Sequence, residues 1–214
     1  MSDIQSCQRC RGSGIILADG AYRACPDCLP PDASQPSLPS LDDASAWGHS
    51  NTDDQQRWAE ILASARDYAA KPQGWLVLYG EAGSGKTTLL RAIAQRMRQH
   101  GYSPTLASCI DCPVESPTAS RIWAQSLVSA PILLIDDVGI DPPTYHSQHA
   151  LLYLIYRRYE LRSPTVFAVS VHRRDLRPTL ASRLWDARQS VVLLLPETDL
   201  RHVHRRPSLF ARQR

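Results

Sequence analysis

One glycine-rich loop has the residue types and the spacing that bind phosphate. The run Gly80-Glu81-Ala82-Gly83-Ser84-Gly85-Lys86-Thr87 fits the eight-position P-loop pattern, between an apolar run and a helical segment. Its glycines let backbone amides turn toward phosphate oxygens beside a helix N-terminus. Lys86 would reach the β- and γ-phosphates, and the Thr87 hydroxyl would bind Mg²⁺. The loop therefore predicts an ATP–Mg²⁺ site; the alternative is a turn that only joins a strand to a helix. The candidate nucleotide-binding residues are Gly80, Glu81, Ala82, Gly83, Ser84, Gly85, Lys86, Thr87 and Thr88.

Two consecutive carboxylates, Asp136 and Asp137, follow a second apolar run, Pro131–Ile135. Open α/β sheets bind ligands at the carboxyl ends of their strands, where these side chains would lie. Asp136 would hold Mg²⁺ through water, and Asp137 would orient or deprotonate an attacking water. A kinase for small molecules must exclude water, so this pair favours a nucleoside triphosphatase. The alternative is that both carboxylates cap the next helix.

Four cysteines form two Cys-x₂-Cys knuckles that are fourteen residues apart: Cys7, Cys10, Cys25 and Cys28. This spacing is typical of a four-thiolate Zn²⁺ site. Between the knuckles, Asp19-Gly20 is a hairpin-turn dipeptide flanked by Ile15–Leu17 and Tyr22–Ala24, which would bring the two knuckles together. Metal binding would supply most of the folding energy of so small a unit. Disulfides and an iron–sulfur cluster are the alternatives.

A third pair, Cys109 and Cys112, has no second knuckle left to complete a metal site. Buried thiols are the interpretation we favour for this pair. A redox-active pair is the alternative.

Short apolar runs alternate with helical segments from residue 52 onward, and this alternation predicts a parallel sheet flanked by helices. A capping-box pattern at Thr52 and Gln55 predicts the start of the first helix. The expected strands are Trp75–Tyr79, Thr105–Ser108, Ile132–Ile135, Thr165–Ser170 and Val191–Leu195. The expected later helices cover residues 86–99, 119–129, 144–162 and 178–187.

Composition divides the chain into four parts. Residues 1–28 are the expected zinc-binding module, and residues 29–51, rich in proline and serine, are the expected flexible linker. Residues 52–201 are the expected P-loop α/β domain, and residues 202–214 a basic tail.

The charge of the chain is distributed unevenly along its length. Lys71 and Lys86 are its two lysines, and the other 22 of its 24 basic residues are arginines. Residues 157–214 contain 13 arginines and 5 acidic residues, which suggests a polyanion such as single-stranded DNA as a partner. Arginines lining a subunit interface are the alternative. The arginines and histidines concerned are Arg157, Arg158, Arg162, Arg173, Arg174, Arg177, Arg188, His202, His204, Arg205 and Arg206. We see no membrane-spanning run or secretory signal, so a cytoplasmic protein is expected.

The motifs together resemble a known family. The run Gly74–Gly80 entering the P-loop and the run Leu133–Gly139 resemble the DnaC/DnaI-type bacterial replicative helicase loaders of the AAA+ superfamily. Three further segments add to the likeness: Tyr156-Arg157-Arg158-Tyr159, Ser163-Pro164-Thr165-Val166 and Leu180-Ala181-Ser182-Arg183-Leu184. The resemblance implies an ATPase of DNA replication whose partners are a replicative DNA helicase and single-stranded DNA. It also implies self-association in the ATP state and an N-terminal zinc module that docks on the helicase. The alternatives are an IstB-type transposition helper ATPase and a non-hydrolysing, ATP-gated adaptor.

The resemblance also assigns roles near the end of the domain. Arg183 matches by position the arginine that such proteins insert into the ATP site of a neighbouring subunit, where it stabilises charge on the γ-phosphate. A helix-surface arginine is the alternative. Val171 stands where the family has an asparagine, which leaves Ser170 or His172 as stand-ins. Slow or partner-dependent hydrolysis is therefore expected.

Overall fold

The computed structural model describes residues 15–18, 21–24, 38–47, 52–140 and 144–196 of the 214-residue chain, which divides into two units, Met1–Leu38 and Pro39–Arg214. In the first unit, β1 (Ile15–Ala18) pairs antiparallel with β2 (Ala21–Ala24). Ala18 lies opposite Ala21, so the hairpin predicted at Asp19-Gly20 is confirmed. The four cysteines of the predicted zinc site lie outside the described residues.

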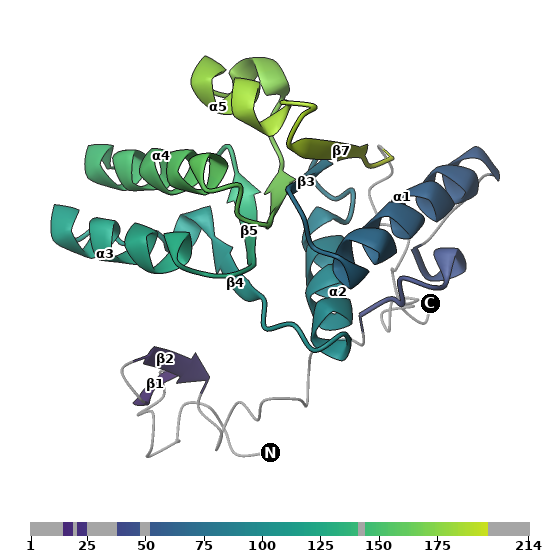
Figure 1. Ribbon diagram of the computed structural model, residues 1–214, viewed down its shortest axis with the longest axis horizontal. Coiled ribbons are helices and arrows are strands. Elements are labelled where there is room, and N and C mark those ends of the chain that lie inside the picture. Colours follow the sequence, from purple (N-terminus) through teal and green to yellow (C-terminus); the bar gives the residue numbers. More distant parts are fainter. Residues whose placement is uncertain (1–14, 19–20, 25–37, 48–51, 141–143, 197–214) are drawn as a thin grey trace, which may run out of the picture. The chain divides into compact units, whose positions relative to one another are not determined.

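A five-stranded parallel sheet forms the centre of the second unit, as the sequence predicts (Figure 1). Its strands are β3 (Trp75–Tyr79), β4 (Thr105–Ser108), β5 (Leu133–Val138), β6 (Thr165–Val169) and β7 (Ser190–Leu194). They lie in the order β4-β5-β6-β3-β7. The three central strands are largely apolar because helices cover both of their faces.

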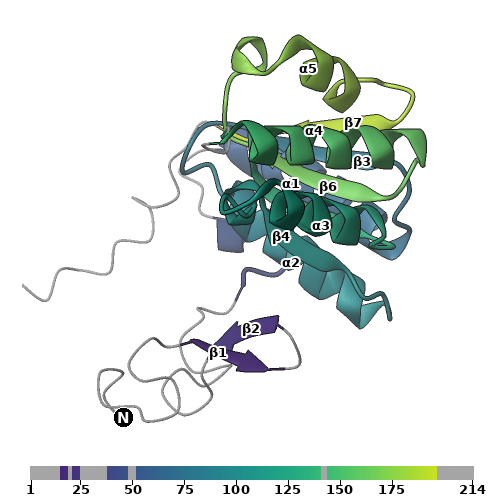
Figure 2. The ribbon, with the colours of Figure 1, turned by 90° about the vertical axis from the view of Figure 1, so that its left-hand side faces the viewer.

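Helices pack on both faces of this sheet (Figures 1 and 2). On one face lie α1 (Thr52–Ala70) and α2 (Lys86–Gln99), and on the other α3 (Pro117–Val128), α4 (Tyr145–Glu160) and α5 (Pro178–Leu184). The described residues of this unit also form three short 3₁₀ helices: η2 (Ala44–Trp47), η3 (Cys109–Asp111) and η4 (Arg173–Asp175). Each face of the sheet has its own hydrophobic core, and successive residues of β3 point into opposite cores. Leu76 packs with α1 and α2, whereas Val77 packs with α3 and α4. Within the described ranges, no helix is long and apolar enough to cross a membrane.

The structure differs from the predicted linker 29–51 over its described part, residues 38–47. Leu41 and Trp47 are buried, and the Trp47 ring stacks on Trp58 of α1 with 5.0 Å between ring centroids. Arg66 of α1 donates from Nη1 to the Leu41 carbonyl at 2.6 Å. Two large apolar side chains are enough to order a segment whose proline and serine content suggests a linker. The second unit consequently begins at Pro39 rather than at residue 52.

Arg158 of α4 is buried, although the sequence places it in the basic surface. Its guanidinium donates hydrogen bonds of 2.7–3.2 Å to the carbonyls of Leu127, Val128, Ala130 and Pro164 and to Thr165 Oγ1. Burial lowers the pKa of Arg158 to about 10, so the side chain stays charged at neutral pH. The C-terminal carbonyls of α3 carry partial negative charge, which favours a cation there. Arg158 therefore ties the end of α3 to the loop that enters β6 and does not face solvent.

Candidate nucleotide-binding site

The predicted P-loop connects β3 directly to α2. Tyr79 ends the strand and Lys86 begins the helix, as the sequence predicts. Gly83 and Gly85 adopt φ values of 87° and 90°, a left-handed conformation that is strained for residues with a side chain. These glycines turn the chain back toward the N-terminus of α2, whose free amides and dipole favour an anion.

Lys86 lies inside this loop with 5% of its surface exposed. Its Nζ donates to the carbonyls of Gly80 at 2.8 Å and Glu81 at 2.5 Å, and contacts Ser84 Oγ at 3.4 Å. The ammonium group of Lys86 is therefore held by carbonyl oxygens of the loop itself. Phosphate oxygens of a bound nucleotide would take the place of these carbonyls as its hydrogen-bond acceptors. Thr87 and Thr88 are half-buried in the first turn of α2, whereas Glu81 and Ala82 are exposed.

Asp136 and Asp137 lie near the carboxyl end of β5, just before Val138, and both are half-buried. Asp137 has a left-handed backbone with φ of 58°, an uncommon conformation for a residue with a side chain. Its backbone N–H donates to Asp136 Oδ1 at 2.9 Å, and its Oδ2 accepts from Ser108 Oγ at 2.7 Å. The Asp137 carboxylate is thus held at Oδ2 by Ser108, which leaves Oδ1 available to a water.

Ser108 is the site residue that our sequence reasoning missed. It ends β4, pairs in register with Asp136, and donates its hydroxyl hydrogen to Asp137. A polar residue at the end of the expected strand Thr105–Ser108 could have indicated a site residue. No local pattern, however, predicts which strand lies beside β5.

Val171 lies two residues after the end of β6, at the position where the family resemblance predicts an asparagine. A Cβ added to Gly139, whose φ is 104°, would lie 2.2 Å from Val171 Cγ2 and 3.1 Å from Leu176 Cδ2. Val171 therefore packs closely against the chain that leaves β5. The two stand-ins differ: Ser170 is half-buried and donates its N–H to the Val138 carbonyl, whereas His172 is exposed.

The strand order brings the P-loop and the two carboxylates to one edge of the sheet. Val169 of β6 pairs on one side with Tyr79, which leads into the P-loop, and on the other with Val138, which follows the carboxylates. One strand thus separates Lys86 from Asp136 and Asp137. The Thr87 hydroxyl and the Asp136 carboxylate are oxygen donors of the kind that Mg²⁺ prefers.

Arg183 lies on α5 against α4. Its guanidinium sits 4.0 Å from the centre of the Tyr156 ring and 5.4 Å from that of Tyr159, and Nη1 donates to the Thr179 carbonyl at 2.8 Å. Its Nε is buried and makes no hydrogen bond. These contacts hold Arg183 on its own subunit, so an action on a neighbouring ATP site stays a prediction.

Cys109 and Cys112 are buried free thiols, which is the interpretation that the sequence analysis favoured. Burial raises the pKa of Cys109 far above its usual value, with the nearby Asp137 charge adding to the effect, and raises that of Cys112 to about 11. Both thiols are therefore protonated, and hence weak nucleophiles, at neutral pH.

A family model described as AAA ATPase domain matches residues 55–201. Three solved structures have the same fold. A replication initiator DnaA bound to AMPPCP and single-stranded DNA has a TM-score of 0.58 at 19% identity, and the match covers 76% of this chain and 51% of that one. The structure of DnaI has a TM-score of 0.58 at 17% identity, and the match covers 75% of this chain and 89% of DnaI. The structure of the DnaC helicase loader has a TM-score of 0.56 at 15% identity, and the match covers 74% of this chain and 97% of that one. The chain thus spans about half the length of the DnaA structure. No curated protein matches it.

Proposed function

The chain belongs to the AAA ATPase domain family, and from this premise we propose that it binds and hydrolyses ATP with Mg²⁺ as a helicase-loader-like protein of DNA replication. One observation carries the proposal: Lys86 and the pair Asp136–Asp137 lie at the same edge of the sheet, one strand apart. A buried cation in a phosphate-binding loop and a carboxylate held one strand away are two of the groups that ATP hydrolysis uses.

Each residue of this edge has a distinct role in the proposed reaction. Lys86 would exchange the carbonyls of Gly80 and Glu81 for phosphate oxygens, and Thr87 and Asp136 would hold Mg²⁺, which would neutralise phosphate charge. Asp137 Oδ1 accepts a hydrogen bond from the attacking water and takes up its proton. Ser108 holds Oδ2, so that the carboxylate cannot rotate away.

Asp137→Asn is expected to lower ATP turnover by about 10²–10⁴-fold, because an amide cannot accept the proton of the attacking water. ATP binding should change little, since Lys86 and Asp136 remain. Turnover is measured as phosphate release with single-stranded DNA present. Asp111→Asn, an exposed aspartate in η3, is the matched control and should keep wild-type turnover. Equal, measurable turnover in wild type and Asp137→Asn would refute a role for Asp137.

The helicase-loader part of the proposal rests on the shared fold with the DnaI and DnaC structures. We propose a replicative DNA helicase and single-stranded DNA as partners, with self-association in the ATP state. In such an assembly, Arg183 would leave Tyr156 and approach the γ-phosphate of a neighbouring subunit. Co-purification with a replicative helicase from cells of the source organism tests the partner, and recovery of a transposase instead would contradict it.

A second candidate is an ATP-gated adaptor that does not hydrolyse ATP. The observation that favours it is Val171, whose methyl groups pack against Gly139 where an amide would contact phosphate or water. This candidate predicts tight ATP binding and equally absent phosphate release in wild type and in Asp137→Asn under every partner condition.

We also propose that Cys7, Cys10, Cys25 and Cys28 bind one Zn²⁺. The paired β1–β2 hairpin supports this, because its strands lie between the two knuckles in sequence and run back along each other.

Purified protein handled without chelators should contain about one zinc per chain by metal analysis, and Cys25→Ser should lose most of it. Cys112→Ser, which alters a cysteine outside the two knuckles, should keep the zinc. Less than about half an equivalent in the wild type would contradict the proposal.

A further inference from the structure

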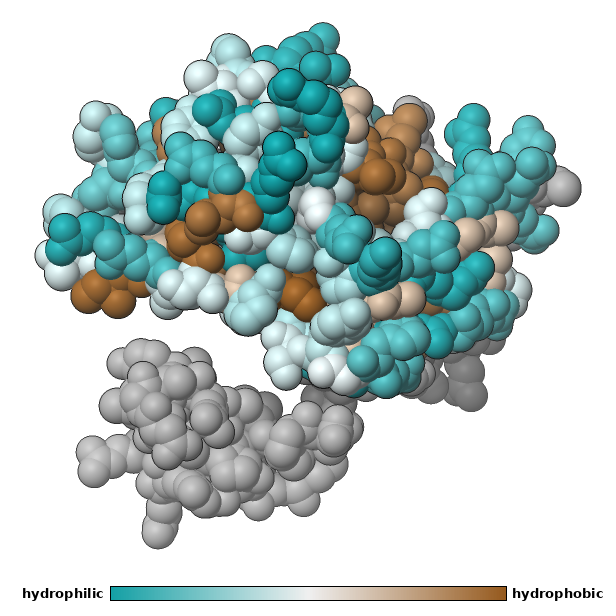
Figure 3. Space-filling view, in the orientation of Figure 1, coloured by the Kyte–Doolittle hydropathy of each residue, from teal (hydrophilic) through white to brown (hydrophobic). Residues whose placement is uncertain are grey.

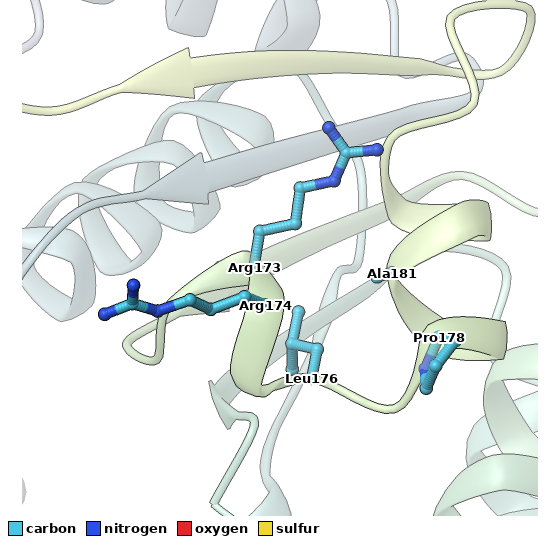
Figure 4. Close-up of a pocket in the computed structure, with 5 residues that line it drawn as sticks. All are labelled: Arg173, Arg174, Leu176, Pro178 and Ala181. Atoms are coloured by element: carbon cyan, nitrogen blue, oxygen red, sulfur yellow. The ribbon is translucent and has the colours of Figure 1, made fainter.

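A pocket with an apolar lining and arginines at its rim lies between η4 and α5 (Figure 4). Its volume is about 460 Å³, and it is lined by Leu176, Pro178, Ala181, Arg173 and Arg174. The Arg174 side chain is 82% exposed, and its Nε lies 3.9 Å from the Asp175 carboxylate, a surface pair that screens its charge weakly. The surface over α5 is largely hydrophilic (Figure 3). The pocket thus combines apolar walls with exposed positive charge.

Exposed rings follow one side of α4. Tyr145 is 76% exposed and lies against the His149 ring with 4.2 Å between centroids. Tyr153, one further turn along, is 41% exposed. Residues four apart share one side of a helix, so the three rings form a row. The described residues of the chain leave most of the Tyr145 side chain uncovered.

The pocket and the row of rings belong to one surface. Arg177, between η4 and α5, donates from Nη2 to Gln148 Oε1 of α4 at 2.7 Å, and Gln148 lies three residues after Tyr145, on the same side of α4. α5 lies beside α4 in both ribbon views (Figures 1 and 2). We call this the arginine–ring surface, formed by Arg173, Arg174, Arg177, Tyr145, His149 and Tyr153.

We infer that the arginine–ring surface binds single-stranded nucleic acid. Guanidinium groups neutralise phosphates, and aromatic rings stack on unpaired bases whatever their sequence. A strand would place phosphates along Arg174 and Arg177, bases on the rings of Tyr145 and His149, and one base in the apolar pocket. Duplex DNA keeps its bases stacked on each other and cannot use the rings. This inference rests on the proposed function, in which single-stranded DNA is a partner, and it assigns that partner a location.

The test is the binding of a fluorescein-labelled oligothymidylate to the full chain, followed by anisotropy over a range of salt concentrations. The double variant Arg174→Glu/Arg177→Glu should weaken binding at least about tenfold at low salt. It should also reduce the slope of log K against log salt by about 1.4, since two phosphate contacts are lost. Arg57→Glu, an exposed arginine of α1 on the opposite face of the sheet, is the matched control and should stay within about twofold.

Tyr145→Ala separates stacking from charge. It should weaken binding about tenfold and leave the salt slope unchanged, because a phenol neutralises no phosphate. Tyr102→Ala, another partly exposed tyrosine, should bind like the wild type.

Binding by both surface variants within about twofold of wild type would overturn the inference and leave the proposed function standing. Duplex DNA that competes as well as a single strand would also overturn it, since rings that stack on bases prefer unpaired ones. A wild type that binds no strand at low salt would refute this surface and the nucleic-acid part of the proposed function. Phosphate release, measured separately, reports on the ATPase proposal alone.

Discussion

Lys86→Ala is expected to lower ATP turnover by about 10²–10³-fold and to weaken ATP binding strongly. The ammonium of Lys86 is the buried positive charge of the phosphate loop, held by the carbonyls of Gly80 and Glu81. Removing a preorganised group that stabilises transition-state charge costs rate of this order. Lys86→Arg should rescue little, because a planar guanidinium does not fit where a compact ammonium sits among three oxygens. Phosphate release and binding of a fluorescent ATP analogue are the measurements.

The chain supplies its own control for this substitution. Lys71, its other lysine, is exposed just beyond the end of α1. Lys71→Ala removes the same charge from a position outside the loop and should leave both measurements unchanged. Similar losses in the two variants would mean that general charge, and not the loop, controls nucleotide binding.

Arg158→Met is expected to lower the free energy of unfolding by about 3–5 kcal/mol, the largest effect on stability that we anticipate. Methionine fills much of the volume but leaves buried carbonyls of the α3 C-terminus without their donor, and a buried unsatisfied polar group costs about 1–3 kcal/mol. Arg158→Lys should be less harmful, since an ammonium satisfies part of the same set. Urea unfolding followed by tryptophan fluorescence measures the change.

Arg157 provides the matched control, because it is adjacent in sequence and its charge is paired at the surface. Its Nη1 lies 2.6 Å from Glu160 Oε2, and its side chain is 44% exposed. Arg157→Met should therefore cost less than about 1 kcal/mol. Equal destabilisation by the two variants would contradict the structural role that we assign to Arg158.

These two arginines mark where sequence reasoning reaches its limit. Counting charges along the sequence treats Arg157 and Arg158 alike. In the structure, Arg158 is buried in the core, whereas Arg157 is exposed to water. The difference arises from three partners of Arg158 that are distant in sequence, the carbonyls of Leu127, Val128 and Ala130. The packing of Leu41 and Trp47 on α1 was missed for the same reason.

Local patterns predicted the elements well. The strand Trp75–Tyr79 and the helix 86–99 have the bounds that were expected, because an apolar run, glycines and a P-loop define them. The strand expected at Ile132–Ile135 instead runs from Leu133 to Val138, through both aspartates. We took Asp136 and Asp137 as the end of this strand because charged residues are uncommon within strands. Pairing with β4 and β6 nevertheless extends β5 as far as Val138. Strand order, and with it the Ser108–Asp137 contact, depends on pairing that no local pattern encodes.

The position of β6 has a geometric consequence for the reaction. Neighbouring strands of a sheet are about 4.8 Å apart, so the interposed strand sets the origins of the P-loop and the carboxylates about 10 Å apart. Directly adjacent strands would leave half that width. The wider gap has room for a phosphoryl group and a water molecule in line with it. The strand order thereby sets the width of the space in which the proposed reaction would take place.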